Sequence, residues 1–521
     1  MSDFRGLRRS AVLAATICIL CLTPAMAAVK LPAIIGSHMV LQASSPLTIW
    51  GWADPGEDVM VTFGDTKASA KADGAGKWLV KLPAMQASDQ PREMTIVGKN
   101  TIQLTDILVG EVWLASGQSN MEWSVAASDN PETEIKAADH PKIRLFLVPK
   151  VPSRTPANDV QTAWTVCTPD TVKNFSAVAY FFGRELHQKL ESPVGMIASS
   201  WGGTRIEPWT PPEGFADAAE LEGERKQIEA MRDSYQTALK NALPQFKAWV
   251  EAAEKAAAGG TEIGDPPAAP ADPYKVYGAP TALYNGMIHP LVPFAIRGAL
   301  WYQGESNRGQ AMHYHDLMKA LIRGWRTVWG QGNFPFLYVQ LAPFRYDNNV
   351  TALPEIWEAQ TATLAVPNTG MAVTTDIGNV SDIHPRNKQE VGRRLARWAL
   401  ANTYGKTDVV FSGPTYESLA VDGKQIRLKF KHAHGGLAAR DGKPLTWFSV
   451  AGADKKFVKA NATIDGETVL VESPEVASPV AVRFGWHQLA EPNLMNKAGL
   501  PAVPFRTDEW KDAVSAPAEG Q

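Results

Sequence analysis

The pattern of hydrophobic and polar positions divides the chain into three parts. From Leu31 to about Thr105, short apolar or alternating runs are separated by turns such as Asp54-Pro55-Gly56. This pattern is typical of a small β-sandwich or jelly-roll module. From about Ile107, apolar runs alternate with amphipathic stretches, which favours a doubly wound α/β sheet. From Asp408 onward short β-type runs return and predict a second β module.

The central part contains five predicted buried strands and two predicted amphipathic helices. The strands are expected at Val109–Ala115, Val194–Ser199, Arg297–Tyr302, Phe336–Leu341 and Gly370–Thr375. The helices are expected at Ser176–Leu190 and Tyr314–Val328. This alternation implies a mainly parallel sheet with helices on its faces.

One segment interrupts the alternation. Ala218–Ala258 is rich in Glu, Lys, Gln and Ala, has apolar residues near helical spacing, and is followed by the Pro/Ala-rich stretch Pro266–Pro273. We interpret it as a helical insertion splayed off the sheet. A position over a functional site and a plain surface hairpin are both open. The expected organisation is a signal peptide (1–27), a β-sandwich or jelly-roll module (28–105), an α/β domain (106–405) with an insertion near 214–275, a β module (406–510) and a tail (511–521).

The N-terminal residues predict export. Arg5, Arg8 and Arg9 precede the apolar stretch Ala11–Leu22, and Ala25-Met26-Ala27 fits a small-residue cleavage site. These features are typical of a secretory signal peptide, and the apolar stretch is too short for a membrane anchor. Cleavage there leaves 494 of the 521 residues in the periplasm or outside the cell, without membrane attachment.

Composition and charge narrow the function classes. The chain has a net charge of −3 and 45% hydrophobic residues, which are ordinary globular values. A nearly neutral chain argues against nucleic acid or an anionic membrane as a partner, and the oligomeric state is open. Only Cys167 lies outside the predicted signal peptide, so we expect no internal disulfide and a packing role for this thiol. The 17 tryptophans offer flat faces of the kind that stack on sugar rings.

The stretch Gly110–Trp123, GEVWLASGQSNMEW, contains the first candidate for chemistry. An apolar run ends at Gly117, and Ser119 lies on the bend beyond it. A serine between a strand and a helix can hold its hydroxyl clear of the sheet, near backbone N–H groups that stabilise an oxyanion. Taken alone, a plain loop is the simpler interpretation, because Gly, Ser and Asn are all common in turns.

Four segments together match one known family. They are GQSNM (Gly117–Met121), SSWGGT (Ser199–Thr204), WYQGESN (Trp301–Asn307) and DIHPRNKQEVGRRLA (Asp382–Ala396). In this order they resemble the sialate O-acetylesterase-like branch of the SGNH (GDSL-like) hydrolases, and the resemblance extends from about Leu31 to Asp508. It implies an SGNH-type doubly wound parallel sheet of the flavodoxin-like three-layer kind, and a serine esterase without a cofactor.

The resemblance also implies a catalytic triad. Ser119 is the candidate nucleophile, and His384 is the candidate base because an imidazole takes up and releases protons near neutral pH. Asp382 is the candidate for orienting the His384 ring. In the wider superfamily the Asp and His usually stand three residues apart, and Ser381 occupies that position here. Asp376 as the orienting residue, or a Ser–His dyad, is therefore an alternative.

The oxyanion donors are expected from three of the segments. The resemblance implies the backbone N–H of Ser119 and that of Gly202 or Gly203, together with a side chain of the QGESN segment. Gln303 is the first candidate because its amide donates two hydrogen bonds, and Asn307 is the second.

Three residues are predicted to contact the substrate, namely Trp201, Arg205 and Glu305. For Arg205 an ordinary ion pair is the alternative role, and for Glu305 the alternative is to brace neighbouring loops. No metal is expected, because the pairs His313/His315 and His432/His434 lack a carboxylate–cysteine cluster.

Ser306 is a weaker candidate for the nucleophile. The segment Gly304-Glu305-Ser306-Asn307-Arg308 departs from the Gly-x-Ser-x-Gly pattern at its last position. This argues against a typical α/β-hydrolase lipase.

These observations predict an exported serine esterase that removes O-acetyl groups from glycans through an acetyl-enzyme intermediate. The glycan is 9-O-acetylated sialic acid or a neutral plant cell-wall polysaccharide such as xylan or xyloglucan, and the Trp-rich, slightly acidic chain favours the neutral one. The alternative is a non-catalytic glycan-binding protein on a hydrolase scaffold. The presence of both Ser119 and His384 argues against it.

Overall fold

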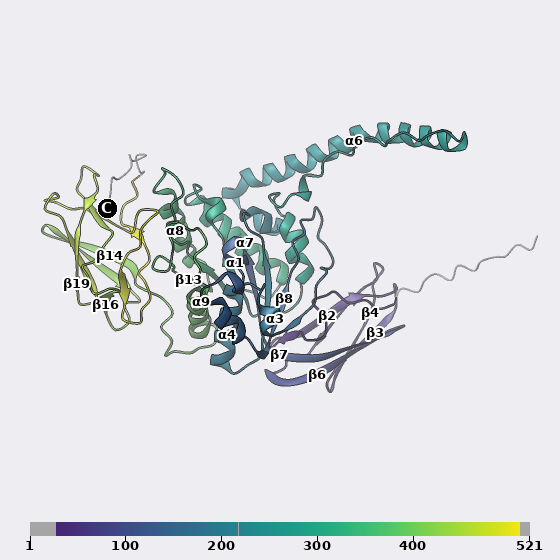
Figure 1. Cartoon of the computed structure of the whole chain (residues 1–521), viewed down its shortest axis with the longest axis horizontal. Helices are drawn as coiled ribbons and strands as arrows, with labels where there is room; N and C mark the ends of the chain where they lie inside the picture. The colour runs from purple at the N-terminus through teal and green to yellow at the C-terminus, as the bar shows by residue number, and fades with distance from the viewer. Residues whose placement is uncertain (1–27, 217, 511–521) are drawn as a thin grey trace, which may run out of the picture.

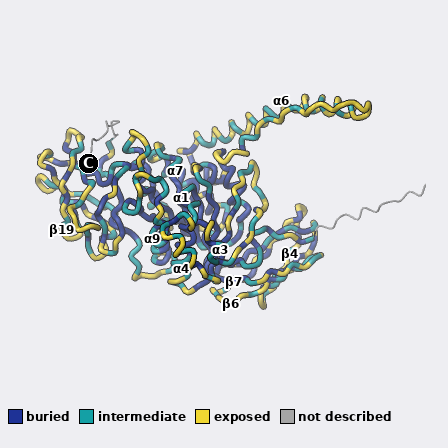
Figure 2. The backbone as a smooth tube through the Cα atoms, viewed as in Figure 1, coloured by how far each residue is buried: buried dark blue, intermediate teal, exposed yellow. Residues whose placement is uncertain are grey.

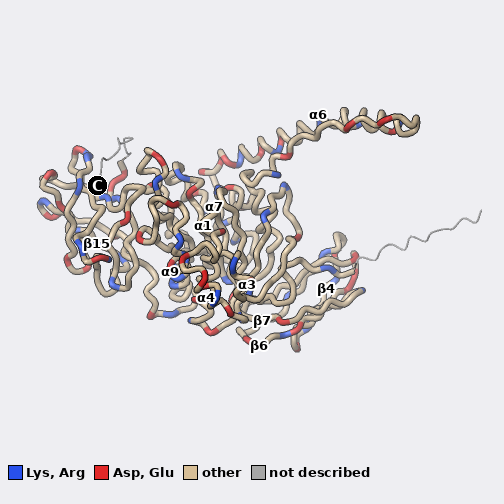
Figure 3. Tube along the Cα trace, in the orientation of Figure 1, with Lys and Arg blue, Asp and Glu red and all other residues tan. Residues whose placement is uncertain are grey.

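The computed structural model describes residues 28–216 and 218–510. The predicted signal peptide (1–27) and tail (511–521) lie outside the described residues. Along the described chain an N-terminal β region, a central α/β region and a C-terminal β region follow one another (Figure 1). Acidic and basic residues are interspersed over all three regions (Figure 3), as the small net charge implies.

The central region is built on a mostly parallel sheet. Its strands lie in the order β13 (Thr369–Ala372), β12 (Phe336–Val339), β11 (Gly298–Tyr302), β7 (Thr101–Gly117), β10 (Val194–Ser200), β8 (His140–Leu147) and β9 (Thr165–Cys167). All neighbouring pairs are parallel except β8–β9. The strand order reverses at β7, and the prediction of an α/β region on a mainly parallel sheet is confirmed. The order is not that of flavodoxin, because the chain returns through β9 and α4 to place β10 between β7 and β8.

Helices cover the central sheet in two groups. In one group, α4 (Ala177–Leu190) packs against α9 (Lys388–Asn402), and the pair contacts β10, β12 and β13. In the other, α7 (His313–Trp329) packs between α5 (Pro212–Phe215) and α8 (Ala352–Ala362). Every residue of β10, β11 and β12 is buried, which is the mark of a parallel sheet covered on both faces. The short helices α1 (Ser119–Glu122), α2 (Pro131–Lys136) and α3 (Pro169–Val172) lie in the connections.

One long strand belongs to two parts of the fold. The first half of β7 pairs antiparallel with β6 (Ser88–Val97), which pairs with β3 (Asp58–Phe63) and through it with β4 (Thr66–Lys71). Its second half lies in the central sheet, beside β1 (Val40–Gln42) and β10. The strand bends at Asp106, whose positive φ of 56° is held by two hydrogen bonds from the buried Arg144. The expected boundary between residues 105 and 106 therefore falls inside β7.

Each of the two terminal β regions also contains sheets that are not part of the central sheet. Near the N-terminus, β2 (Leu47–Trp52) and β5 (Lys77–Leu82) pair with each other. At the C-terminus one sheet contains β14 (Thr415–Asp422), β15 (Gln425–Lys431), β20 (Thr468–Glu472) and β19 (Asn461–Asp465), and another contains β18 (Val458–Lys459), β17 (Phe448–Ala451), β21 (Ala481–Phe484) and β23 (Phe505–Arg506). The pair β16 (Leu437–Ala439) and β22 (Leu494–Asn496) accompanies them. These strands enclose a hydrophobic core of their own, which supports the predicted C-terminal β module.

The predicted helical insertion forms α6 (Glu222–Ala258), which projects away from the body (Figure 1). None of its 37 residues is buried, and the tube is coloured exposed or intermediate along its length (Figure 2). Met231 packs against a small apolar cluster of Tyr274, Ala279 and Ala282 in the returning chain. Farther out, the indole N–H of Trp249 donates to the Gly264 carbonyl at 2.7 Å. The helix is thus stabilised by its own returning chain rather than by the sheet.

Candidate active site

Ser119 lies at the carboxyl end of β7, between β10 and β11. The strand ends at Gly117, whose φ of +143° and closeness to the Tyr302 carbonyl leave no room for a side chain. The N–H of Gln118 donates to the same carbonyl at 3.0 Å, and Ser119 then begins α1. Within the described chain the N–H of Ser119 has no hydrogen-bond acceptor. This is the crevice in which ligands bind in open α/β sheets.

His384 faces the same cavity from the loop between β13 and α9. Ser119 and His384 both line this cavity, which has a volume of about 840 Å³. The His384 ring stacks on the indole of Trp123, with 4.6 Å between the centroids and 14° between the planes. Trp123 follows α1 directly, so the nucleophile turn carries the surface against which the imidazole rests.

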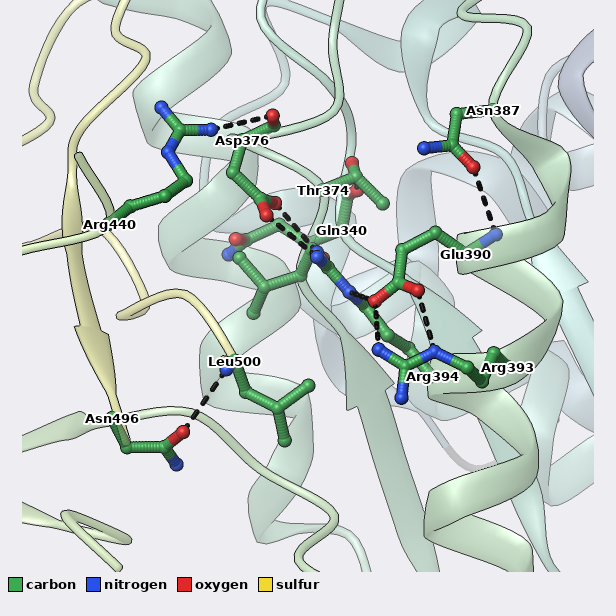
Figure 4. A network of polar contacts seen from close by, with 11 residues as sticks. Gln340, Thr374, Asp376, Asn387, Glu390, Arg393, Arg394, Arg440, Asn496 and Leu500 are labelled. Carbon is green, nitrogen blue, oxygen red and sulfur yellow. Dashed lines mark hydrogen bonds and ion pairs between the residues drawn. The ribbon is translucent and has the colours of Figure 1, made fainter. Parts of the chain in front are cut away.

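Asp382 and Asp376 differ in how they lie relative to His384. The Asp382 carboxylate accepts the backbone N–H of His384 at 2.9 Å, and its oxygen lies 3.9 Å from Nδ1 of the ring. Asp376 instead forms a two-point ion pair with Arg394 at 2.6 and 2.7 Å, beside Glu390 (Figure 4). The structure therefore brings Asp382 close to the ring, beyond direct hydrogen-bond distance, and leaves Asp376 committed elsewhere.

The surroundings of His384 favour its neutral form. Burial lowers the pKa of the imidazole below its ordinary value of 6.5, and the nearby positive charge of Lys388 lowers it further. The carboxylates of Asp382 and Glu122 act in the opposite direction and do not outweigh these effects. A neutral imidazole is the form that accepts a proton from a serine hydroxyl.

The two candidate glycines behave differently. A side chain on Gly202 would lie 3.2 Å from Cβ of Ser119, so this backbone closely approaches the nucleophile. Its N–H donates to the Glu122 carboxylate at 2.7 Å, and Glu122 pairs with Lys150 at 2.5 Å. Gly203 has a φ of +75°, and its N–H has no acceptor in the part of the chain that the structure describes.

Gln303 does not face the cavity. It is fully buried, and its amide nitrogen lies near three acceptors, the side chain of Gln118 at 3.1 Å, the carbonyl of Thr204 at 3.2 Å and the side chain of Asn307 at 2.7 Å. Its amide oxygen accepts the hydroxyl of Tyr314 at 2.8 Å. The side chain therefore ties three loops together and has no donor left over.

Asn307 is committed in the same way. Its oxygen accepts the N–H of Ile206 at 3.0 Å, and its nitrogen donates to Glu207 at 3.0 Å and Gln310 at 2.8 Å. The side chain is 1% exposed. Neither amide of the QGESN segment is thus placed to meet an oxyanion in this structure.

The residue after the nucleophile, Asn120, joins three of the four segments. Its amide nitrogen donates to Glu305 at 2.6 Å and to the Ile383 carbonyl at 3.0 Å, and its oxygen accepts Nζ of Lys388 at 2.5 Å. The carboxylate of Glu305 is buried, and the residue braces these loops rather than lining the cavity. The sequence analysis assigned no role to four other residues of the GQSNMEW stretch, which are Gln118, Asn120, Glu122 and Trp123. Their position next to Ser119 in the sequence could have indicated that they support the site.

Aromatic and charged side chains also line the cavity. Trp201 lies between the ring of Tyr277, 5.4 Å away, and the ammonium of Lys150, 5.8 Å away. Tyr277 belongs to the chain that returns from α6, and neither Tyr277 nor any described residue of α6 lines the cavity. Arg205 forms an ion pair with Glu207 at 2.7 Å and does not line the cavity.

The other candidate histidines and Cys167 make contacts outside this cavity. His313 lies 2.6 Å from Glu224, His315 bonds to Thr363 at 2.9 Å, and His432 stacks on His434. Among residues 28–216 and 218–510 there is no group of three ligands suited to a metal, and no helix is long and apolar enough to cross a membrane. Burial raises the pKa of the Cys167 thiol to about 12, which makes it unreactive.

Comparisons with known proteins agree on one family. A family model described as carbohydrate esterase, sialic acid-specific acetylesterase, matches residues 109–251 and 255–401. The chain belongs to this family. Sialate O-acetylesterase from Mus musculus is 31% identical over 427 residues, which are 73% of this chain and 74% of the relative. The human sialate O-acetylesterase is 30% identical, covering 74% of this chain and 73% of the relative.

A solved structure extends the similarity to nearly the whole fold. The crystal structure of a carbohydrate acetylesterase from Xanthomonas citri is 38% identical, with a TM-score of 0.78, and covers 92% of this chain and 100% of that one. The expected family is thereby confirmed, and so is the expectation of a carbohydrate O-acetylesterase. Membership in a family of esterases goes against the alternative of a non-catalytic glycan-binding protein.

Proposed function

We propose that the chain is an exported serine esterase that removes O-acetyl groups from neutral glycans through an acetyl-enzyme intermediate. The proposal is carried by one observation, that Ser119 and His384 line the same cavity at the carboxyl ends of the central strands. The lowered pKa of His384 supports its role as the base, because the ring is neutral when the reaction begins.

The reaction has two halves. His384 accepts the hydroxyl proton of Ser119 while the Ser119 oxygen bonds to the acetyl carbon. The tetrahedral intermediate then expels the sugar oxygen, which takes the proton from His384. In the second half His384 takes a proton from water, and the resulting hydroxide attacks the acetyl-enzyme. Ser119 then regains a proton from His384 as acetic acid leaves, which ionises to acetate in solution.

The developing oxyanion is bound by backbone groups in this proposal. The N–H of Ser119 is the first donor, because it begins a helix at the cavity and has no acceptor within the described chain. The N–H of Gly203 is the second donor, since that of Gly202 is bonded to Glu122. Gln303 and Asn307 act on the oxyanion only indirectly, by holding the loops that carry these N–H groups.

The charges around the cavity favour a neutral sugar over sialic acid. Lys150 is the one Lys or Arg among the described residues that line the cavity, and it is paired with Glu122. Arg205 is paired with Glu207. The carboxylate of a sialic acid would therefore meet no uncommitted cation, whereas a neutral sugar needs none. The aromatic faces of Trp123 and Trp201 suit the apolar faces of sugar rings.

Acetate release from acetylated xylan, acetylated xyloglucan and a 9-O-acetylated sialoside tests this preference. The wild type is expected to have the larger kcat/KM on a neutral substrate. Glu122→Gln frees the Lys150 ammonium and is expected to raise the relative kcat/KM for the sialoside, while Lys150→Met is the matched control that lowers it. A wild-type enzyme that prefers the sialoside contradicts the proposed substrate class.

Export is proposed from the sequence of residues 1–27 alone. The arginines, the apolar stretch and the Ala25-Met26-Ala27 site support cleavage after Ala27. N-terminal sequencing of the protein recovered from the periplasm or culture medium is expected to begin at Ala28. Recovery of the intact chain from the cytosol would contradict it.

A further inference from the structure

A buried lysine contacts the residue that follows Ser119. Lys388 lies in the first turn of α9, four residues after His384, and is 0% exposed. Its Nζ donates to the amide oxygen of Asn120 at 2.5 Å and lies 5.2 Å from the centre of the Tyr302 ring. Burying an ammonium is costly unless it is bonded, so a lysine here calls for a specific role.

The lysine acts on the site through one amide. Asn120 directly follows Ser119, and its nitrogen donates to the carbonyl of Ile383, which directly precedes His384. The same nitrogen donates to Glu305. The ammonium requires the amide oxygen and the carboxylate requires the amide nitrogen, so the orientation of the Asn120 side chain is determined from both sides.

We propose that Lys388 is a positioning residue of the esterase, which holds the Ser119 turn and the His384 loop at a fixed separation through Asn120. This inference rests on the proposed roles of Ser119 and His384. Lys388 touches neither the substrate cavity nor the reacting oxygen, so its effect passes through its neighbours.

The positive charge of Lys388 predicts a second measurable effect, on the pH dependence of the reaction. The charged groups facing His384 are Lys388 from α9, Asp382 from its own loop and Glu122 from α1. Those facing Lys388 are Glu305 and Asp382. Burial lowers the pKa of Lys388 to about 7 and raises that of Glu305. Below pH 7 the lysine is therefore charged, in the range where His384 takes up its proton, and it opposes that uptake.

The test compares Lys388→Met with Arg393→Met in the full-length enzyme. Arg393 lies on the same helix and pairs with Glu390, outside the Asn120 contacts, so it controls for loss of a cation from α9. For Lys388→Met we expect kcat to fall about 10- to 100-fold with KM little changed, because the reacting groups are misplaced. The acid limb of the kcat/KM profile is expected to move up by about one pH unit. Arg393→Met is expected to leave that limb in place.

Two further variants keep the test decisive. If Lys388→Met does not fold, the double variant with Glu305→Gln removes both buried charges, and the same shift of the acid limb is expected in it. Asn120→Ala breaks the bridge while keeping the lysine, and is expected to lower kcat without the full shift of the limb. Normal kcat and an unmoved limb in the lysine variants, beside an inactive Ser119→Ala, overturn this inference alone. Full activity in both Ser119→Ala and His384→Ala overturns the proposed function as well.

Discussion

Helix α9 carries two buried cations whose surroundings differ. Arg394 forms two hydrogen bonds to Asp376 and one to Glu390, and these partners raise its pKa (Figure 4). Lys388 bonds to a single neutral amide, and burial lowers its pKa to about 7. Arg394 is thus fully paired with carboxylates, whereas Lys388 forms no ion pair with a carboxylate within the described chain.

The difference separates a structural cluster from a functional one. Arg394 ties the segment after β13 to α9, and its positive charge is neutralised by the carboxylates of Asp376 and Glu390. Among the described residues Lys388 hydrogen-bonds to Asn120 alone, while Glu305 and Asp382 act on it from a longer distance, and its charge still lowers the pKa of His384. Incompletely compensated charge in the interior is typical of a site where protons move. Changes to the first cluster should therefore affect unfolding, and changes to the second should affect turnover.

The largest effect is expected for Ser119→Ala. It removes the attacking oxygen, so hydrolysis of p-nitrophenyl acetate and of acetylated glycan should fall by about 10⁴- to 10⁶-fold. The midpoint of thermal unfolding should stay close to that of the wild type, because Ser119 is only partly buried and the change removes a single atom. A variant with near-normal activity would show that another residue is the nucleophile, with Ser306 the next to test.

Arg394→Met should show the opposite behaviour. It leaves the Asp376 carboxylate without its partner, while Glu390 keeps Arg393, and should lower the free energy of unfolding by about 3–5 kcal/mol. Denaturant unfolding measures this loss. The fraction that stays folded is expected to keep the wild-type kcat and pH profile. A selective loss of kcat with unchanged stability would place Arg394 in the functional cluster.

A smaller effect is expected for Asp382→Asn. The carboxylate is 44% exposed and lies 3.9 Å from the His384 ring, so we expect kcat/KM to fall by less than about tenfold. Asp376→Asn is the comparison, and it should lower stability while sparing kcat. If Asp382→Asn approaches the loss caused by His384→Ala, the carboxylate must bond to the ring once substrate is bound.

The smallest expected effect concerns the pH dependence of the wild type. His384 must be neutral to act as a base, so kcat/KM falls as the pH drops through its pKa. Because that pKa is lowered, the acid limb should have its midpoint below 6.5. Initial rates between pH 4 and 8 measure it. A profile that is flat down to pH 4 contradicts the histidine mechanism.

Much of the architecture could be predicted because it depends on local periodicity. Apolar runs bounded by turns indicated β7, β10, β11, β12 and β13, whereas β8 and β9 of the same sheet were not predicted. Amphipathic spacing indicated α4 and α7 within a residue or two of their ends. The position of β10 between β7 and β8 could not be predicted, since strand order depends on contacts between distant residues. The same holds for the bend at Asp106, which depends on Arg144 in another strand.

The reacting residues of the candidate site could be predicted from the sequence. The residues that hold them in place could not. Ser119 and His384 lie in recognisable segments and share a cavity. Gln303 was expected at the oxyanion because its amide donates two bonds, yet both are used within the protein. Residue type indicates what a side chain can bond, whereas only the fold decides which bonds it makes. The contact of Lys388 with Asn120 joins residues 268 positions apart, and no sequence spacing reveals it.

The 17-residue strand β7 has a mechanical consequence. Its pairings with β6 and with β10 lie on one strand that bends at Asp106, and Ser119 lies just beyond its end. A hinge between the N-terminal β region and the central sheet would require this strand to break. The two regions should therefore move together as one rigid unit. A force or a thermal fluctuation that acts on the N-terminal sheets would then reach Ser119 through β7, because no flexible linker separates the two regions.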